Sequence, residues 1–63
     1  MRINFVENRF GGIVHYMMSY GNDVYVPRIG ETVSLGNGPR YIVESIHFDM
    51  LDNILEILVK ELL

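Results

Sequence analysis

The sequence predicts one small domain over residues 1–63, of mainly β structure and built as a barrel of five short strands. The length allows a single domain and a small core, because a chain this short buries only roughly 60% of the surface that its unfolded form exposes. Short apolar segments alternate with turns rich in glycine, asparagine and proline, which is typical of strands and hairpins. The usual sources of extra stability are disulfides, a metal or association with another chain, and the lack of cysteine removes the first and weakens the second.

The first predicted strand covers residues 2–6, where Ile3 and Phe5 lie on one side. Two glycines in residues 7–12 predict a turn, and residues 13–20, rich in β-branched and aromatic side chains, predict the return strand.

Further turns and strands follow along the chain. A turn at 21–23 leads into an extended segment that Pro27 confines to a sheet edge or a strand end. A tight turn at 29–31 precedes a strand at 32–35, and the Gly-Asn-Gly-Pro segment at 36–39 predicts a hairpin.

The longest predicted strand, residues 40–50, changes its apolar face between Glu44 and Ser45. A change of phase by one residue indicates a β-bulge, which bends a strand. Bent strands are what a small barrel needs at its corners.

The C-terminal segment fits two structures. A helix is favoured by apolar residues at helical spacing, namely Leu51, Ile54, Leu55, Leu58 and Leu62. A strand places Leu55, Ile57 and Val59 inward after a two-residue turn at Asp52-Asn53, but leaves Leu58 on the other face. We favour the strand, with a short helix as the alternative, because a last strand covers an otherwise open sheet edge.

The charge of the chain is uneven. The net charge is −3, with +1 over residues 1–40 and −4 over residues 41–63, which disfavours a general polyanion binder. The acidic end either faces a basic partner or only keeps a small protein soluble. No apolar run is long enough for a signal core or a membrane span, so we expect an intracellular protein without a membrane partner.

Residues with catalytic or metal-binding chemistry are sparse. None of the serines stands in a nucleophile motif, and His15 and His47 lie far apart without a short-spaced ligand pair. We therefore expect no catalytic residues, no metal and no cofactor, and the chain is predicted not to be an enzyme.

Tyrosine and arginine offer a binding surface, because these residue types dominate interface hot spots. Tyr25 and Arg28 flank Pro27, and Arg40 and Tyr41 open the next strand, so the four are predicted to form a partner-binding patch. The alternative is structural: the tyrosines close the barrel ends and the arginine stems cover apolar surface.

The C-terminal strand also suggests self-association. Residues 53–63 hold seven aliphatic residues in eleven, and as a strand this segment turns Ile54 and Leu58 outward. An exposed apolar patch usually marks an interface, so these two residues are predicted to pair two copies in a homodimer. The competing explanation is that Leu62 and Leu63 fold back over an open end of the barrel.

Part of the sequence resembles a known family. The segments VPRIGETVSL at 26–35 and YIVESIHFD at 41–49, separated by a Gly-Asn turn, resemble small SH3-like β-barrel proteins of bacteria and their phages. The resemblance covers roughly residues 24–60 and implies an SH3-like barrel and a non-enzymatic binding module.

The function expected on this basis is protein interaction, for example as an inhibitor or host-takeover factor encoded by a phage or mobile element. Such a protein acts in the cytoplasm of a bacterial host. The alternative is a small-ligand or nucleic-acid binder, in which Arg28 and Arg40 hold a phosphate while Tyr25 and Tyr41 stack on a base.

Overall fold

The computed structural model contains five β-strands and, in the residues it describes, no helix. These residues are 1–7, 12–18, 26–36 and 38–62, with the backbone only for 16–18. Residues 8–11 of the turn predicted at 7–12, and the whole turn predicted at 21–23, lie outside them, while Glu7 and Gly12 belong to strands. The strands are β1 (Arg2–Glu7), β2 (Gly12–Met18), β3 (Thr32–Ser34), β4 (Arg40–Asp49) and β5 (Ile54–Glu61). Within the described ranges, no helix of the length and apolarity that a bilayer requires is present.

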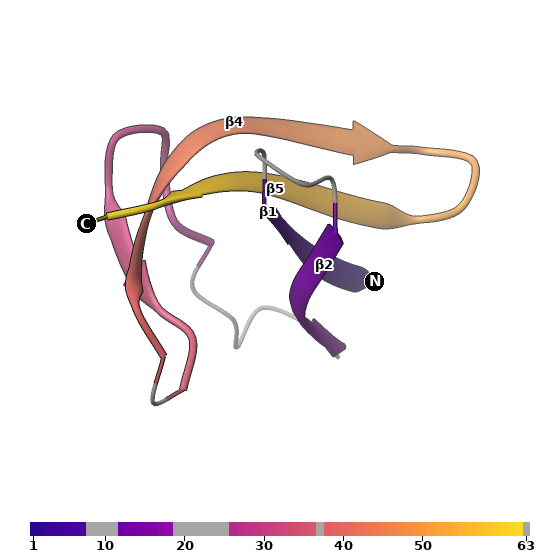
Figure 1. Ribbon diagram of the computed structural model, residues 1–63. Helices are drawn as coiled ribbons and strands as arrows, with labels where there is room; N and C mark the ends of the chain where they lie inside the picture. The colour runs from indigo at the N-terminus through magenta and orange to yellow at the C-terminus, as the bar shows by residue number, and fades with distance from the viewer. Residues whose placement is uncertain (8–11, 19–25, 37, 63) are drawn as a thin grey trace.

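All five strands belong to one sheet, in the order β2-β1-β5-β4-β3. Neighbouring strands are antiparallel except β1 and β5, which run parallel. The sheet is strongly curled into a half-barrel (Figure 1). The prediction of a small, five-stranded, mainly β domain with a C-terminal strand is confirmed, and the helical alternative is wrong.

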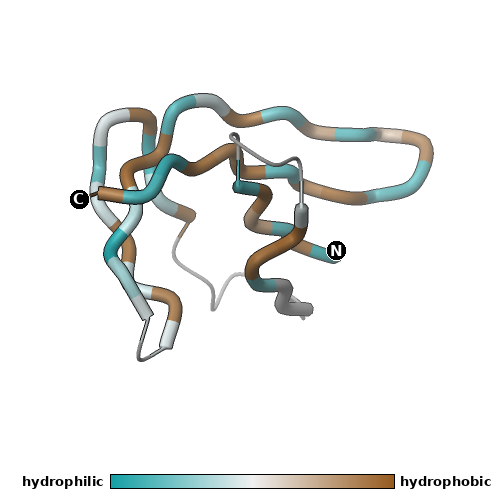
Figure 2. Tube along the Cα trace, viewed as in Figure 1, coloured by the Kyte–Doolittle hydropathy of each residue, from teal (hydrophilic) through white to brown (hydrophobic). Residues whose placement is uncertain are grey.

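The core lies on the inner face of this curl and is built mainly by β1 and β5. Burial alternates along β5, so every second side chain points inward, although most residues of the strand are hydrophobic (Figure 2). The inward residues are those predicted for the strand, and Ile57 and Val59 are fully buried. The whole core consists of Ile3, Phe5, Val43, Leu55, Ile57 and Val59.

Two bulges bend the sheet. The register of β4 against β5 shifts between Val43 and Ser45, which confirms the bulge predicted there. A second shift lies between β1 and β2, where Phe5 pairs with His15 and Val6 with Ile13, so β2 carries the extra residue. Because a bulge increases the local twist and bends its strand, β4 curves over the sheet as Figure 1 shows.

The loop between β4 and β5 is longer than predicted. Asp49 pairs with Ile54, so four residues form the loop rather than Asp52 and Asn53 alone. The Asp49 carboxylate explains the difference, because its Oδ1 accepts the backbone N–H groups of Leu51 (3.1 Å) and Asp52 (3.2 Å). Asn53 then adopts a left-handed conformation with φ of 55°, which asparagine tolerates better than most residues.

We expect β5 to determine stability. Replacing fully buried Ile57 by alanine should lower the free energy of unfolding by about 3 kcal/mol, and by valine about 1 kcal/mol, because a cavity is left in the core. Urea denaturation measures both. Leu51→Ala is the control: this side chain is 96% exposed, so its loss should change stability by less than about 0.5 kcal/mol. Equal effects at the two positions would contradict this assignment of the core.

Candidate functional site

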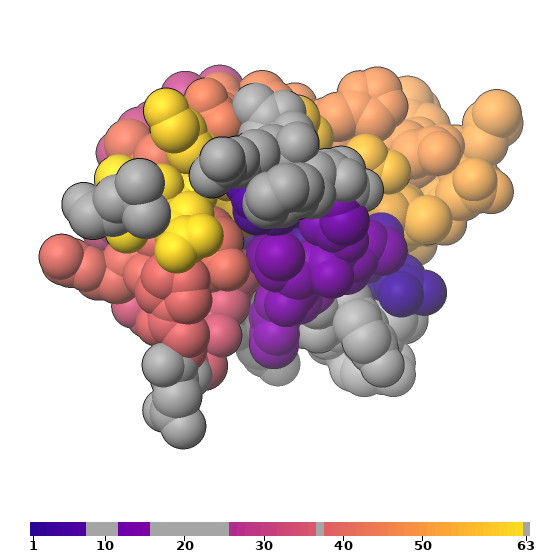
Figure 3. All heavy atoms as spheres, in the orientation of Figure 1, coloured from indigo at the N-terminus to yellow at the C-terminus, as the bar shows by residue number. Residues whose placement is uncertain are grey.

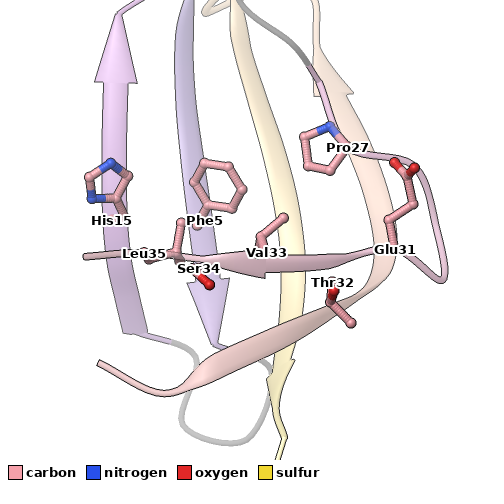
Figure 4. Close-up of a pocket in the computed structure, with 8 residues that line it drawn as sticks. All are labelled: Phe5, His15, Pro27, Glu31, Thr32, Val33, Ser34 and Leu35. Atoms are coloured by element: carbon pink, nitrogen blue, oxygen red, sulfur yellow. The ribbon is translucent and has the colours of Figure 1, made fainter. Parts of the chain in front are cut away.

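An open groove of about 650 Å³ lies between β3 and the strands β1 and β2 (Figure 4). In this view β3 crosses in front of β1 and β5, while Phe5 and His15 belong to the strands behind it. The described residues that line the groove are Phe5, His15, Pro27, Glu31, Thr32, Val33, Ser34 and Leu35.

The base of the groove is apolar and its rim is polar. Phe5 is a buried core residue, and its ring lies 6.0 Å from the ring of exposed His15, tilted by 50°. Val33 and Leu35 are half-buried and pack against the core from the other side. Thr32 and Ser34 alternate with Val33 and Leu35 along the chain and are exposed, so their hydroxyl groups lie at the rim of the groove.

A tight turn fixes where β3 begins. The N–H of Glu31 donates to the carbonyl of Arg28 (3.0 Å), and Gly30 between them has φ of 92°, which defines a type II turn. The N–H of Arg28 in turn donates to Oε1 of Glu31 (2.6 Å). Glycine is needed at the third position because a positive φ costs other residues free energy.

The same turn ends in a β-bulge, which determines which residues of β3 form backbone hydrogen bonds with β4. The N–H of Gly30 donates to the carbonyl of Val43 (2.8 Å), and the N–H of Val43 donates to the carbonyl of Glu31 (2.9 Å). This is the pattern of a bulge with glycine at its first position. Val43 is therefore hydrogen-bonded to the turn. From this point on, the residue pairs between β3 and β4 alternate between non-hydrogen-bonded and hydrogen-bonded pairs.

This alternation of hydrogen bonds leaves one edge of β3 without a pairing strand among the described residues. Thr32 pairs with Ile42 and Ser34 with Arg40, one position to either side of the pair of Val33 with Tyr41. By the alternation of an antiparallel ladder, the N–H and C=O groups of Thr32 and Ser34 point away from β4. Since β3 is the last strand of the sheet, no described strand pairs with it on that side. Among the described residues, an unpaired strand edge thus borders an apolar groove.

The residues predicted as a partner-binding patch lie elsewhere. Tyr25 falls outside the described residues. Arg28 and Arg40 are exposed, one in the turn before β3 and the other opposite Ser34 at its far end. Tyr41 is half-buried and packs against the core, and as a neighbour of Arg40 on β4 it points to the opposite face. None of the three described residues lines the groove.

The residues predicted for self-association, Ile54 and Leu58, lie on the outer face of β5 with Glu56 between them. All three side chains are half-buried. Pairing of two copies through this face stays a prediction.

Sequence reasoning missed the groove, because Phe5 and His15 meet β3 only through the curl of the sheet. One signal was available: Pro27 and Gly36 keep the segment between them short, and a short strand is typical of a sheet edge.

The groove offers contact area rather than an arrangement of reactive groups. Among the described residues no hydrogen bond joins His15 to Thr32 or Ser34, and no three His, Asp or Glu side chains gather as metal ligands. What it presents is apolar surface, open backbone groups and hydroxyls, which suit the binding of a chain segment or a small molecule.

Comparison of the chain with protein-family models, with curated proteins and with solved structures finds no match.

The turn before β3 can be tested by Gly30→Ala. We expect this change to lower the free energy of unfolding by about 1–2 kcal/mol, because alanine is strained at φ of 92°. Thermal unfolding followed by circular dichroism measures the loss. Gly38→Ala is the matched control, since no positive φ is recorded there and a Cβ meets open space. If both variants melt alike, the turn does not hold β3.

Proposed function

We propose that this protein is a non-enzymatic interaction module that binds an extended segment of a partner protein in the groove beside β3. The open edge of β3 next to the apolar base formed by Phe5 is the observation that carries the proposal. An extended segment placed there adds a strand to the sheet, which is a recurring way of recognising peptides.

The short length of β3 limits what backbone pairing contributes. Only Thr32 and Ser34 turn their backbone groups to the open edge, and each hydrogen bond adds about 1 kcal/mol net. Most of the affinity must therefore come from side chains that enter the groove and contact Phe5, Val33 and Leu35. Because side chains of a strand alternate, the partner segment should carry apolar residues at every second position.

The size of the groove agrees with this role. About 650 Å³ lies within the range of about 300–1,000 Å³ that is typical of ligand pockets. The resemblance of residues 24–60 to SH3-like barrel proteins of bacteria and phages also supports a binding module. The biological setting that we propose from it is inhibition of a host protein by a protein that a phage or mobile element encodes.

The proposal can be tested with short random peptides displayed on phage and selected on the full chain. We expect the selected peptides to show alternating apolar residues. Ser34→Pro should weaken their binding at least about tenfold, because proline removes the open-edge N–H, while the melting temperature stays nearly unchanged. Fluorescence anisotropy with labelled peptide measures the affinity.

Ser34→Ala is the matched control, because it removes the hydroxyl but keeps the N–H; it should bind like the natural protein. The proposal fails if Ser34→Pro binds the selected peptides unchanged. It also fails if the chain binds oligonucleotides instead, with an affinity that falls steeply with salt and is lost in Arg28→Ala and Arg40→Ala. That result would establish the nucleic-acid alternative.

A further inference from the structure

The hairpin arm, which we define as residues 44–56 at the end of β4 and the start of β5, exposes large apolar side chains. Ile46 (37%) and Phe48 (43%) lie opposite the core residues Ile57 and Leu55, so they extend the inner apolar face along the arm. At the tip, Met50 is 82% and Leu51 is 96% exposed. β3 pairs only with residues 40–42 of β4, so the arm extends beyond it and protrudes in Figure 3.

Hydrogen bonds hold the tip in place. The Asp49 carboxylate accepts the N–H groups of Leu51 and Asp52, as described above. The carbonyl of Asn53 accepts the N–H of Arg2 (3.2 Å), which ties the loop to the start of β1. The apolar side chains are thus presented on a backbone that is already ordered, and a partner that covers them pays little ordering entropy.

The charge of the arm is distinct from that of the remaining chain. The arm contains four carboxylates and no lysine or arginine, so it carries −4 while the rest of the chain carries +1. The four carboxylates are those of Glu44, Asp49, Asp52 and Glu56. Apolar side chains and a negative field therefore occur together at one end of the molecule.

We propose that the hairpin arm is a second docking surface, which inserts Met50 and Leu51 into an apolar pocket with a cationic rim on a partner protein. Charge complementarity identifies this occupant, because lysine or arginine around such a pocket pairs with the carboxylates of the arm. Methionine suits the role, since its flexible side chain adapts to the shape of a pocket.

The same negative charges disfavour two other partners for an exposed apolar tip, namely a second copy of the chain and an anionic membrane. Two copies that met through their arms would bring together two segments of charge −4, and the repulsion between like charges across the interface would oppose this association. An anionic membrane surface would repel the carboxylates in the same way. A cationic protein surface is attracted at a distance, so association should be fastest at low salt.

Three synthetic peptides of equal length test the surface: alternating lysine and leucine, alternating lysine and serine, and alternating glutamate and leucine. The full chain labelled with ¹⁵N is titrated with each. We expect the lysine–leucine peptide to shift the amide signals of residues 46–53, and the other two to shift these arm signals only at concentrations at least about tenfold higher, because each lacks one of the required properties.

Two pairs of variants locate the binding. Met50→Ser with Leu51→Ser should weaken binding of the lysine–leucine peptide at the arm at least about tenfold, whereas Ile29→Ser, at an apolar residue that is 64% exposed and not part of the arm, should leave it unchanged. Asp52→Lys should weaken binding more than Glu61→Lys, which makes the same change in net charge at exposed Glu61 outside the arm.

Ser34→Pro distinguishes binding in the groove from binding at the arm, because it removes the open-edge N–H of β3. This variant should bind the lysine–leucine peptide at the arm as the natural protein does. If Ser34→Pro abolishes that binding, the peptide occupies the groove and the second surface is refuted. The proposal also fails if the glutamate–leucine peptide shifts the arm signals at the same concentration as the lysine–leucine peptide. Sedimentation that shows a dimer broken by Leu51→Ser would instead assign the arm to self-association. Binding to vesicles of phosphatidylcholine and phosphatidylserine in equal parts, lost in Leu51→Ser, would assign it to membranes.

Discussion

The parallel pairing of β1 with β5 is the constraint on which the rest of the structure depends. It joins the two ends of the chain and places β5 in the middle of the sheet, between β1 and β4. Two of the fully buried side chains, Ile57 and Val59, belong to this central strand. Contacts between segments so far apart in sequence form only after a large loop is closed, so the domain gains its core when both ends are present together.

This pairing also decides which edges stay open. With β1, β5 and β4 in the centre, β2 and β3 become the outer strands of the sheet. Bulges bend the sheet until β3 passes over Phe5, but among the described strands β2 and β3 form no ladder with each other. The groove is therefore the place where the half-barrel remains open, and its apolar base is the same residue layer that stabilises the fold.

The sequence allowed most strands to be predicted but little of the site. Alternation around Ile3 and Phe5 and the change of phase at Glu44 are local signals, and both were correct. The four-residue loop was missed because its cause is a side chain, the Asp49 carboxylate that accepts two backbone N–H groups. The parallel register of β1 on β5 leaves no local signal, since each strand alternates in the same way whichever neighbour it has. His15 and Leu35 line one groove only because of that register and the curl, so no spacing in the sequence could bring them together.

The distribution of apolar residues relates the stability of this small chain to the binding that we propose. A domain of 63 residues has too little interior to cover all of its apolar side chains. Near the turn at Gly30, β3 covers the inner face only in part and leaves the groove. Along the arm the same inner face continues through Ile46 and Phe48 without a covering strand among the described residues, in a segment that also carries four carboxylates. The two surfaces are thus two ends of one apolar layer. A partner bound in the groove would contact the core residue Phe5, and a partner bound at the arm would cover apolar residues that continue the inner face, so binding at each surface should stabilise the folded chain.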